Sequence, residues 1–246
     1  MATPRERADK LLVDRGLVLS RERAKALIMA GQVVAGDHLV LKPGQLLDLS
    51  LELRIKGDLP FVSRGGLKLQ KALDQFSIDV SGLTVMDVGA STGGFTDCLL
   101  QRGACRVFAV DVGYGQLAWK LRQDDRVLSL EKTNIRYLEP SSLPSVPDMA
   151  VIDASFISLE KVLPNTLRLI SESGEIIALV KPQFEVGRGE VGKGGVVRDS
   201  QKHDAVIESV CNLARSLQLE VVGLTESPVL GPKGNREFLL YLKKQK

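Results

Sequence analysis

The stretch Val85-Met-Asp-Val-Gly-Ala-Ser-Thr-Gly-Gly-Phe95 decides the fold, because it joins a short apolar run to a glycine-rich turn that opens a helical pattern. In open sheets of parallel strands, such a turn lies at the carboxyl edge of the first strand, where ligands bind. Its Gly-x-x-x-Gly-Gly spacing fits neither the dinucleotide pattern Gly-x-Gly-x-x-Gly nor a P-loop, which needs Gly-Lys-Ser/Thr. The turn therefore predicts an α/β domain and argues against a ligand held through its phosphates.

Further apolar runs alternate with helical patterns and extend the predicted sheet to seven strands. This alternation is typical of a parallel sheet wrapped by helices, and the last two runs suggest an antiparallel hairpin. Seven strands in this order indicate a Rossmann-like domain. The runs are Val85–Val88, Val107–Val112, Val127–Leu130, Met149–Ile152, Ile176–Val180, Leu219–Leu224 and Phe238–Leu242.

Acidic residues around the turn favour a cationic ligand that carries a nucleoside. Asp87 would repel a pyrophosphate but attract ammonium and sulfonium groups, both of which S-adenosylmethionine carries. Asp111, at the end of the second run, has the position of an acid that binds ribose hydroxyls, although alone it could be a hydrated strand-end acid. Asn134 is a candidate for the adenine side or, equally, a turn or cap residue. The expected cofactor residues are Asp87, Gly89, Ala90, Ser91, Gly93, Gly94, Phe95, Asp111 and Asn134.

Charged residues adjoin three more of the apolar runs. Asp153 follows the fourth run, Lys181 follows the fifth, and Glu237 opens the last. A charge beside a buried run is costly unless it is paired. These residues therefore predict either a structural ion cluster or a functional site at the sheet edge.

A fourth charged residue comes from the helix predicted after Gly65-Gly66. At about 100° per residue, Lys68 lies roughly 90° from the centre of the apolar face, whereas Lys71 lies nearly opposite it. Lys68 is therefore the one that borders the sheet. The apolar face comprises Leu69, Ala72, Leu73 and Phe76.

The first part of the chain predicts a separate small α+β domain over residues 1–56. Helices are expected over Glu6–Asp14 and from the N-cap Ser20 to Gly31. Short strands are expected at Val33-Val34, Leu39-Val40 and Leu51–Ile55. Gly and Pro in Lys56–Pro60 break the periodicity. We therefore expect a linker over residues 57–63 and the larger domain over residues 64–246.

Basic residues are concentrated in the small domain: residues 5–25 contain seven Lys or Arg against four acids. This could be a solvated face or a phosphate-binding one. The stretch SRERAKALIMAGQVVAGDHLVLKPGQLL, residues 20–47, resembles the small RNA-binding domain first described in a small-subunit ribosomal protein, which favours RNA. The glycine-rich residues 186–199 could be a mobile surface loop or a lid over bound RNA. The expected RNA contacts are Arg5, Arg7, Arg21, Arg23, Lys25, Arg64, Arg188 and Lys193.

Lys68, Asp153, Lys181 and Glu237, in this order, resemble the Lys-Asp-Lys-Glu tetrad of FtsJ-like ribose 2′-O-methyltransferases. With the N-terminal domain, nearly the whole chain resembles the TlyA, or haemolysin A, family. Its linker differs, because Leu59-Pro-Phe-Val62 stands where the family has Arg-x-Trp-Val. The most specific stretches of the resemblance are Phe61–Leu69, Asp87–Asp97, Asp153–Ser158 and Val180–Glu185.

The resemblance implies methyl transfer from S-adenosylmethionine to ribose 2′-hydroxyls of ribosomal RNA or ribosomal subunits, with cytidine as the target. Lys181 would lie on the attacking oxygen, either taking its proton as a neutral amine or stabilising the alkoxide as a cation. Asp153, Glu237 and Lys68 would orient Lys181. Sequence alone leaves both roles of Lys181 open.

The composition, 246 residues with 44% hydrophobic, 26% charged and a net charge of +3, is that of an ordinary globular protein. No apolar run approaches the ~20 residues that span a bilayer, so we expect a cytoplasmic protein and not a membrane-active haemolysin. An RNA-binding protein without catalysis is a further alternative, which the complete tetrad disfavours. Neither a metal nor an obligatory protein partner is expected. Cys98, Cys105 and Cys211 are expected in the core, and His38 and His203 at the surface.

Overall fold

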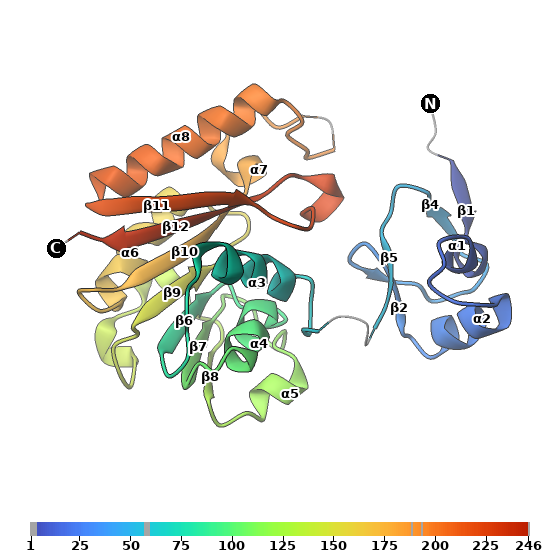
Figure 1. Cartoon of the computed structure of the whole chain (residues 1–246), viewed down its shortest axis with the longest axis horizontal. Helices are drawn as coiled ribbons and strands as arrows, with labels where there is room; N and C mark the ends of the chain where they lie inside the picture. Colours follow the sequence, from blue (N-terminus) through green and yellow to red (C-terminus); the bar gives the residue numbers. More distant parts are fainter. Residues whose placement is uncertain (1–3, 57–59, 188, 193, 246) are drawn as a thin grey trace. The chain divides into compact units, whose positions relative to one another are not determined.

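A computed structural model describes residues 4–56, 60–187, 189–192 and 194–245, which form two compact units, Met1–Pro60 and Phe61–Lys246 (Figure 1). Residues 57–59 of the expected linker and the expected RNA contacts Arg188 and Lys193 lie outside the described residues. Pro60 ends the first unit, and residues 61–63 of the expected linker belong to the second unit, because Phe61 is buried in its core and the Val62 N–H donates to the Asp97 carboxylate at 2.8 Å. The second unit therefore begins before residue 64.

The first unit is a small α+β fold. Ser20 Oγ accepts the Arg23 N–H at 3.2 Å and Gly31 adopts φ of 66°, so the second helix begins and ends where its sequence predicts. Glu6 and Arg7 lie in a strand and not in the first helix, because they pair antiparallel with an unpredicted strand, β4. The elements are β1 (Arg5–Arg7), α1 (Ala8–Asp14), α2 (Arg21–Met29), β2 (Val33–Ala35), β3 (His38–Leu39), β4 (Leu46–Asp48) and β5 (Leu53–Ile55).

The second unit contains a seven-stranded sheet in the order β11-β12-β10-β9-β6-β7-β8. Strands β8, β7, β6, β9 and β10 are parallel, and β12 lies antiparallel between β10 and β11. All seven predicted strands are present. Asp111 and Val112 lie just beyond β7, which begins one residue earlier and ends two residues earlier than predicted. The strands are β6 (Thr84–Val88), β7 (Arg106–Val110), β8 (Val127–Leu130), β9 (Met149–Ile152), β10 (Glu175–Val180), β11 (Leu219–Glu226) and β12 (Phe238–Lys244).

Helices cover both faces of this sheet, since side chains along each buried strand alternate between two apolar clusters. In β10, for example, Ile176, Ala178 and Val180 pack with α6 and α8, while Ile177 and Leu179 pack with α3 and α4. The helices are α3 (Gly65–Phe76), α4 (Gly94–Gln101), α5 (Trp119–Arg122), α6 (Leu159–Leu169), α7 (Pro182–Glu185) and α8 (Ser200–Ser216), with 3₁₀ turns η1 (Ile135–Tyr137), η2 (Pro140–Ser142) and η3 (Pro232–Gly234).

Two predictions about single residues are wrong. His203 is only 3% exposed, because its ring packs edge-on against Phe238 and its Nε2 lies 2.9 Å from the Val197 carbonyl oxygen. Cys105 is exposed, since it precedes the buried part of β7. Cys98 and Cys211 are buried, as predicted.

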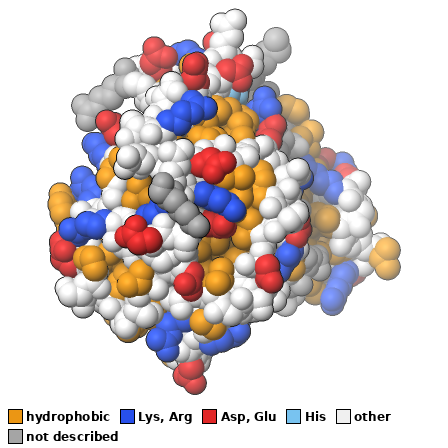
Figure 2. Space-filling model, turned by 60° about the vertical axis from the view of Figure 1, so that its left-hand side comes forward, with side chains coloured by type: hydrophobic (Ala, Val, Ile, Leu, Met, Phe, Trp, Pro, Cys, Tyr) orange, Lys and Arg blue, Asp and Glu red, His pale blue; other side chains and the backbone are white. Residues whose placement is uncertain are grey.

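On the face that Figure 2 displays, cationic and anionic side chains are interspersed with apolar ones. In the part of the chain that the structure describes, none of the helices has the length and apolar character needed to cross a bilayer.

Candidate functional site

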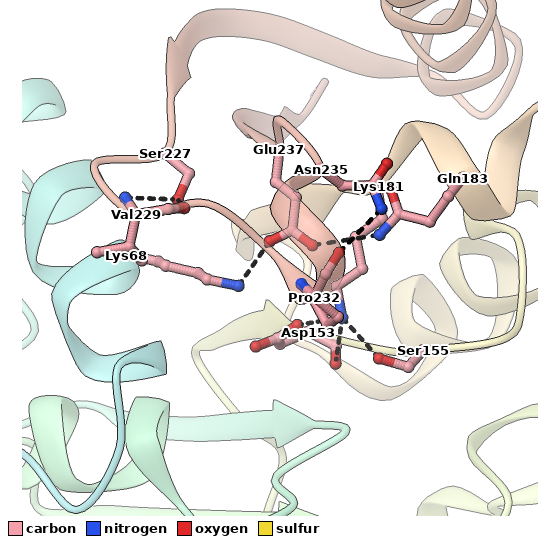
Figure 3. A network of polar contacts seen from close by, with 10 residues as sticks. All are labelled: Lys68, Asp153, Ser155, Lys181, Gln183, Ser227, Val229, Pro232, Asn235 and Glu237. Atoms are coloured by element: carbon pink, nitrogen blue, oxygen red, sulfur yellow. Dashed lines mark hydrogen bonds and ion pairs between the residues drawn. The ribbon is translucent and has the colours of Figure 1, made fainter. Parts of the chain in front are cut away.

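The four charged residues predicted to meet at the sheet edge form two neighbouring ion pairs (Figure 3). Lys68 Nζ lies 2.6 Å from Glu237 Oε2, and Lys181 Nζ lies 2.5 Å from Asp153 Oδ1. Asp153 and Lys181 meet because they follow the adjacent parallel strands β9 and β10. Lys68, Lys181 and Glu237 are 8%, 6% and 1% exposed, so these charges depend on their partners.

Neighbouring residues hold the two pairs in place. Lys181 Nζ also donates to Ser155 Oγ at 2.8 Å and, more weakly, to the Asp153 carbonyl oxygen at 3.4 Å. Gln183 donates to Glu237 Oε1 at 3.4 Å. A Cβ atom at Gly231 would collide with the Glu237 carboxylate, so this glycine allows the close approach. Lys71, by contrast, is partly exposed and donates to Gln75.

A pocket of about 430 Å³ adjoins Asp153 at the carboxyl edge of β6, β7 and β9. Of the expected cofactor residues, Gly89, Ser91, Asp111 and Asn134 line it. Asp153 belongs to both the ion-pair cluster and the pocket wall, and so joins them into one site. The lining residues that the sequence did not single out for the cofactor are Val88, Val110, Val112, Gln116, Thr133, Ile135, Ala154, Ser155, Phe156, Ile157 and Val162.

Backbone contacts fix the turn beside this pocket. Gly89 has φ of 86°, and a Cβ atom there would lie 2.8 Å from the Asp153 carbonyl oxygen, so glycine is required for the ends of β6 and β9 to approach. The Asp111 carboxylate accepts the N–H groups of Ser91 and Gly113, each at 2.7 Å. Asn134 Oδ1 accepts the Arg136 N–H at 3.1 Å and thus caps η1 while lining the pocket.

Other expected cofactor residues serve packing. Asp87 is fully buried beneath the turn, where it accepts the Thr96 hydroxyl at 2.6 Å, and burial raises the pKa of its carboxyl to about 7. Cβ atoms at Gly93 or Gly94 would collide with Leu121 or Ser63. Phe95 is 3% exposed in the core, and Ala90 faces a narrow space beside the main pocket. The turn is therefore supported on the side away from the pocket by Asp87, Gly93, Gly94 and Phe95.

The chemistry of the pocket fits S-adenosylmethionine. Val112, Ile135 and Val162 supply apolar walls for a nucleoside, while Asp111 and Asp153 supply two carboxylates. Two carboxylates attract ammonium and sulfonium groups and would repel a pyrophosphate. The structure therefore supports the preference for a cationic ligand. The carboxylate that lines the pocket beside Asp111 is that of Asp153, and not that of Asp87.

The expected RNA contacts differ in their surroundings. Arg7 and Arg21 bind the buried carboxylate of Asp9 at 3.0 and 2.7 Å, and these contacts lower the pKa of Asp9 to about 2. Part of each guanidinium is therefore engaged within the first unit. Arg23 and Lys25 are exposed on α2. Arg5 is also exposed, in β1, and Arg64 precedes α3 in the second unit.

Comparison with known proteins agrees with this geometry. The FtsJ-like methyltransferase family model matches residues 61–244. The 16S/23S rRNA (cytidine-2′-O)-methyltransferase TlyA of Mycobacterium tuberculosis (strain H37Rv) is 47% identical over 243 residues, which are 98% of this chain and 91% of the relative. Hemolysin A of Brachyspira hyodysenteriae is 38% identical over 237 residues, 96% of this chain and 98% of the relative.

Solved structures show the same fold. A structure from Streptococcus thermophilus matches with a TM-score of 0.78 and 49% identity, covering 100% of this chain and 90% of that one. The N-methyltransferase NodS from Bradyrhizobium japonicum in complex with S-adenosyl-L-homocysteine, at 15% identity and a TM-score of 0.52, shares the fold over 74% of this chain and 86% of its own. The family match over residues 61–244 shows that the chain belongs to the FtsJ-like methyltransferase family.

Proposed function

We propose that this enzyme methylates the ribose 2′-hydroxyl of a cytidine in ribosomal RNA, with S-adenosylmethionine as its methyl donor. The observation that carries the proposal is the position of Lys181. Its amino group forms an ion pair with Asp153, which lines the cofactor pocket. The substrate class rests on relatives such as TlyA of Mycobacterium tuberculosis, whose name describes this activity.

S-adenosylmethionine supplies a methyl group on a sulfonium, which is electrophilic and needs no further activation. This chain's own residues act on the nucleophile. The contact from Lys181 Nζ to the Asp153 carbonyl oxygen, at 3.4 Å, is the weakest of those around Nζ, so an incoming 2′-oxygen can take its place. Lys181 then donates a hydrogen bond to the oxygen and stabilises the negative charge that develops there as the hydroxyl proton passes to solvent water, and alignment with the methyl group supplies much of the rate.

The proposed function is tested by incubating the enzyme with ribosomal subunits and with naked ribosomal RNA in the presence of methyl-labelled S-adenosylmethionine. We expect label in 2′-O-methylcytidine after digestion of the RNA to nucleosides, measured by mass spectrometry. Label in a base, or transfer to DNA and protein at an equal rate, would contradict the proposed substrate class.

RNA affinity is expected to come largely from phosphate contacts of the first unit. Replacing Arg23 and Lys25 together by Ala should flatten the plot of log affinity against log salt by roughly 1 to 2, because each lost phosphate contact removes about 0.7–0.9 from its slope. Both side chains are exposed, so folding should be unaffected.

Filter binding to ribosomal RNA at several salt concentrations measures this slope. Lys71→Ala, which removes a charge from α3, is the matched control and should leave the slope unchanged. Equal slopes for the double variant and the unsubstituted enzyme would show that α2 does not contact RNA phosphates.

A further inference from the structure

The segment that joins β9 to α6, residues 153–158, carries two functions at once. Asp153, Ala154, Ser155, Phe156 and Ile157 all line the cofactor pocket. The same segment holds Lys181, through Asp153 Oδ1 at 2.5 Å and Ser155 Oγ at 2.8 Å. A shift of this segment would therefore disturb the cofactor and Lys181 together.

The segment has little to stabilise it from within. It forms no helix or strand, and Phe156 adopts φ of 63°, a left-handed conformation that costs a non-glycine residue of order 1–3 kcal/mol. The Phe156 side chain is 90% exposed and thus gains little from burial. Such a conformation persists only where surrounding groups impose it.

Glu185 contacts the end of this segment and the first residue of α6 from outside. Its Oε2 accepts the Ser158 hydroxyl at 2.7 Å, and its Oε1 accepts the Leu159 N–H at 2.9 Å. Ser158 Oγ in turn accepts the Glu160 N–H at 3.1 Å, so the two residues together cap the first turn of α6. Glu185 is partly buried, and burial raises the pKa of its carboxyl, while these two donors partly offset the cost of burying the charge.

Glu185 is also connected to Lys181. Lys181 directly precedes the single turn of α7 and Glu185 ends it, and the Phe184 N–H donates to the Lys181 carbonyl oxygen at 2.9 Å. The Phe184 ring lies 5.0 Å from that of Phe156. One short turn therefore joins the lysine, the pocket segment and the start of α6.

We propose that Glu185 is a positioning residue, whose carboxylate fixes the start of α6 and thereby holds residues 154–157 in the shape that binds the cofactor and orients Lys181. The proposal rests on the methyltransferase activity proposed above. Its test is the binding of S-adenosylmethionine without RNA, so it fails or succeeds independently of the RNA substrate.

The experiment compares three substitutions of Glu185 in the full chain by calorimetry with S-adenosylmethionine. Glu185→Ala should weaken binding about tenfold or more, because both contacts are lost. Glu185→Gln keeps the length and an acceptor oxygen, so its affinity should stay within about threefold of the unsubstituted enzyme. Glu185→Asp keeps the charge but is too short to reach both partners, and should bind about as weakly as Glu185→Ala.

Asp148→Ala is the matched control, because Asp148 also accepts a main-chain N–H, that of Thr84 at 2.8 Å, but where β6 begins, away from the pocket. It should bind the cofactor normally. If Glu185→Ala does not fold, the difference in S-adenosylmethionine affinity between Glu185→Gln and Glu185→Asp tests the proposal. Normal affinity in Glu185→Asp, or an equal loss in Glu185→Gln, would overturn the proposal, since length and acceptor geometry would then not matter.

Discussion

Lys181→Ala is expected to transfer methyl groups about 10²–10⁴-fold more slowly than the unsubstituted enzyme, the usual scale for a positioned acid-base group. Its affinity for S-adenosylmethionine should be nearly unchanged, because Lys181 contacts the pocket only through Asp153 and Ser155. Single-turnover methylation of ribosomal RNA, alongside calorimetry with the cofactor, measures the two quantities separately.

Lys71→Ala is the internal control for this experiment. Lys71 lies three residues after Lys68 on α3 but turns away from the cluster and donates to Gln75. It should therefore methylate at the normal rate. A fully active Lys181→Ala together with an inactive Lys71→Ala would show that the charged cluster is structural and that the chemistry lies elsewhere.

Glu237→Leu is expected to lower the free energy of unfolding by about 3–5 kcal/mol, because it leaves the Lys68 ammonium buried without its partner. Lys68 is 8% exposed, so water cannot fully replace the lost carboxylate. Replacing both residues, Lys68→Met with Glu237→Leu, should recover most of this stability, since no isolated charge remains.

Urea unfolding of the two single variants and the double variant measures this recovery. On the proposed function, the double variant should remain poorly active in the methylation assay, because stability returns without the two charges proposed to act beside Lys181. Normal activity in a stable double variant would show that the Lys68–Glu237 pair serves folding alone. A loss of stability in the double variant equal to the sum of the losses in the two single variants would show that the pair is not energetically coupled.

The parts of the fold that follow from local periodicity could be predicted from the sequence. Buried parallel strands are continuous apolar runs, so all seven were recognisable, and the charges that follow them, such as Asp153 and Lys181, had to meet at one edge. The i, i+3, i+4 pattern of α3 separated Lys68 from Lys71 for the same reason. Regular geometry fixes where these side chains point.

Features that depend on contacts between distant segments could not be predicted. The pairing of β1 with β4 converts Glu6 and Arg7 from helix to strand. Gly93 and Gly94 are glycines because the chain around α3 and α5 packs closely against them. A ligand at the turn would require the same residue type, so the sequence alone could not separate packing from binding. His203 is polar in sequence yet buried, because its Nε2 meets the Val197 carbonyl oxygen and its ring packs against Phe238.

The pocket wall shows a further limit. Thr133, Ser155 and Phe156 come from connections without periodicity, so nothing in the local pattern placed them at the cofactor. The sequence signal for this region was the family resemblance of the stretches Asp153–Ser158 and Val180–Glu185. Their contacts, including those of Glu185, appear only once the chain is folded.

The position of β12 between β10 and β11 has a consequence for protein synthesis. A translating ribosome produces β10 and β11 before β12, and until the latter emerges the edge of β10 has no partner and Lys68 has no carboxylate opposite it. Glu237 and Lys68 are 169 residues apart, whereas the first unit is complete by residue 60. Because domains fold as they are made, a nascent chain completes its first unit long before it can methylate.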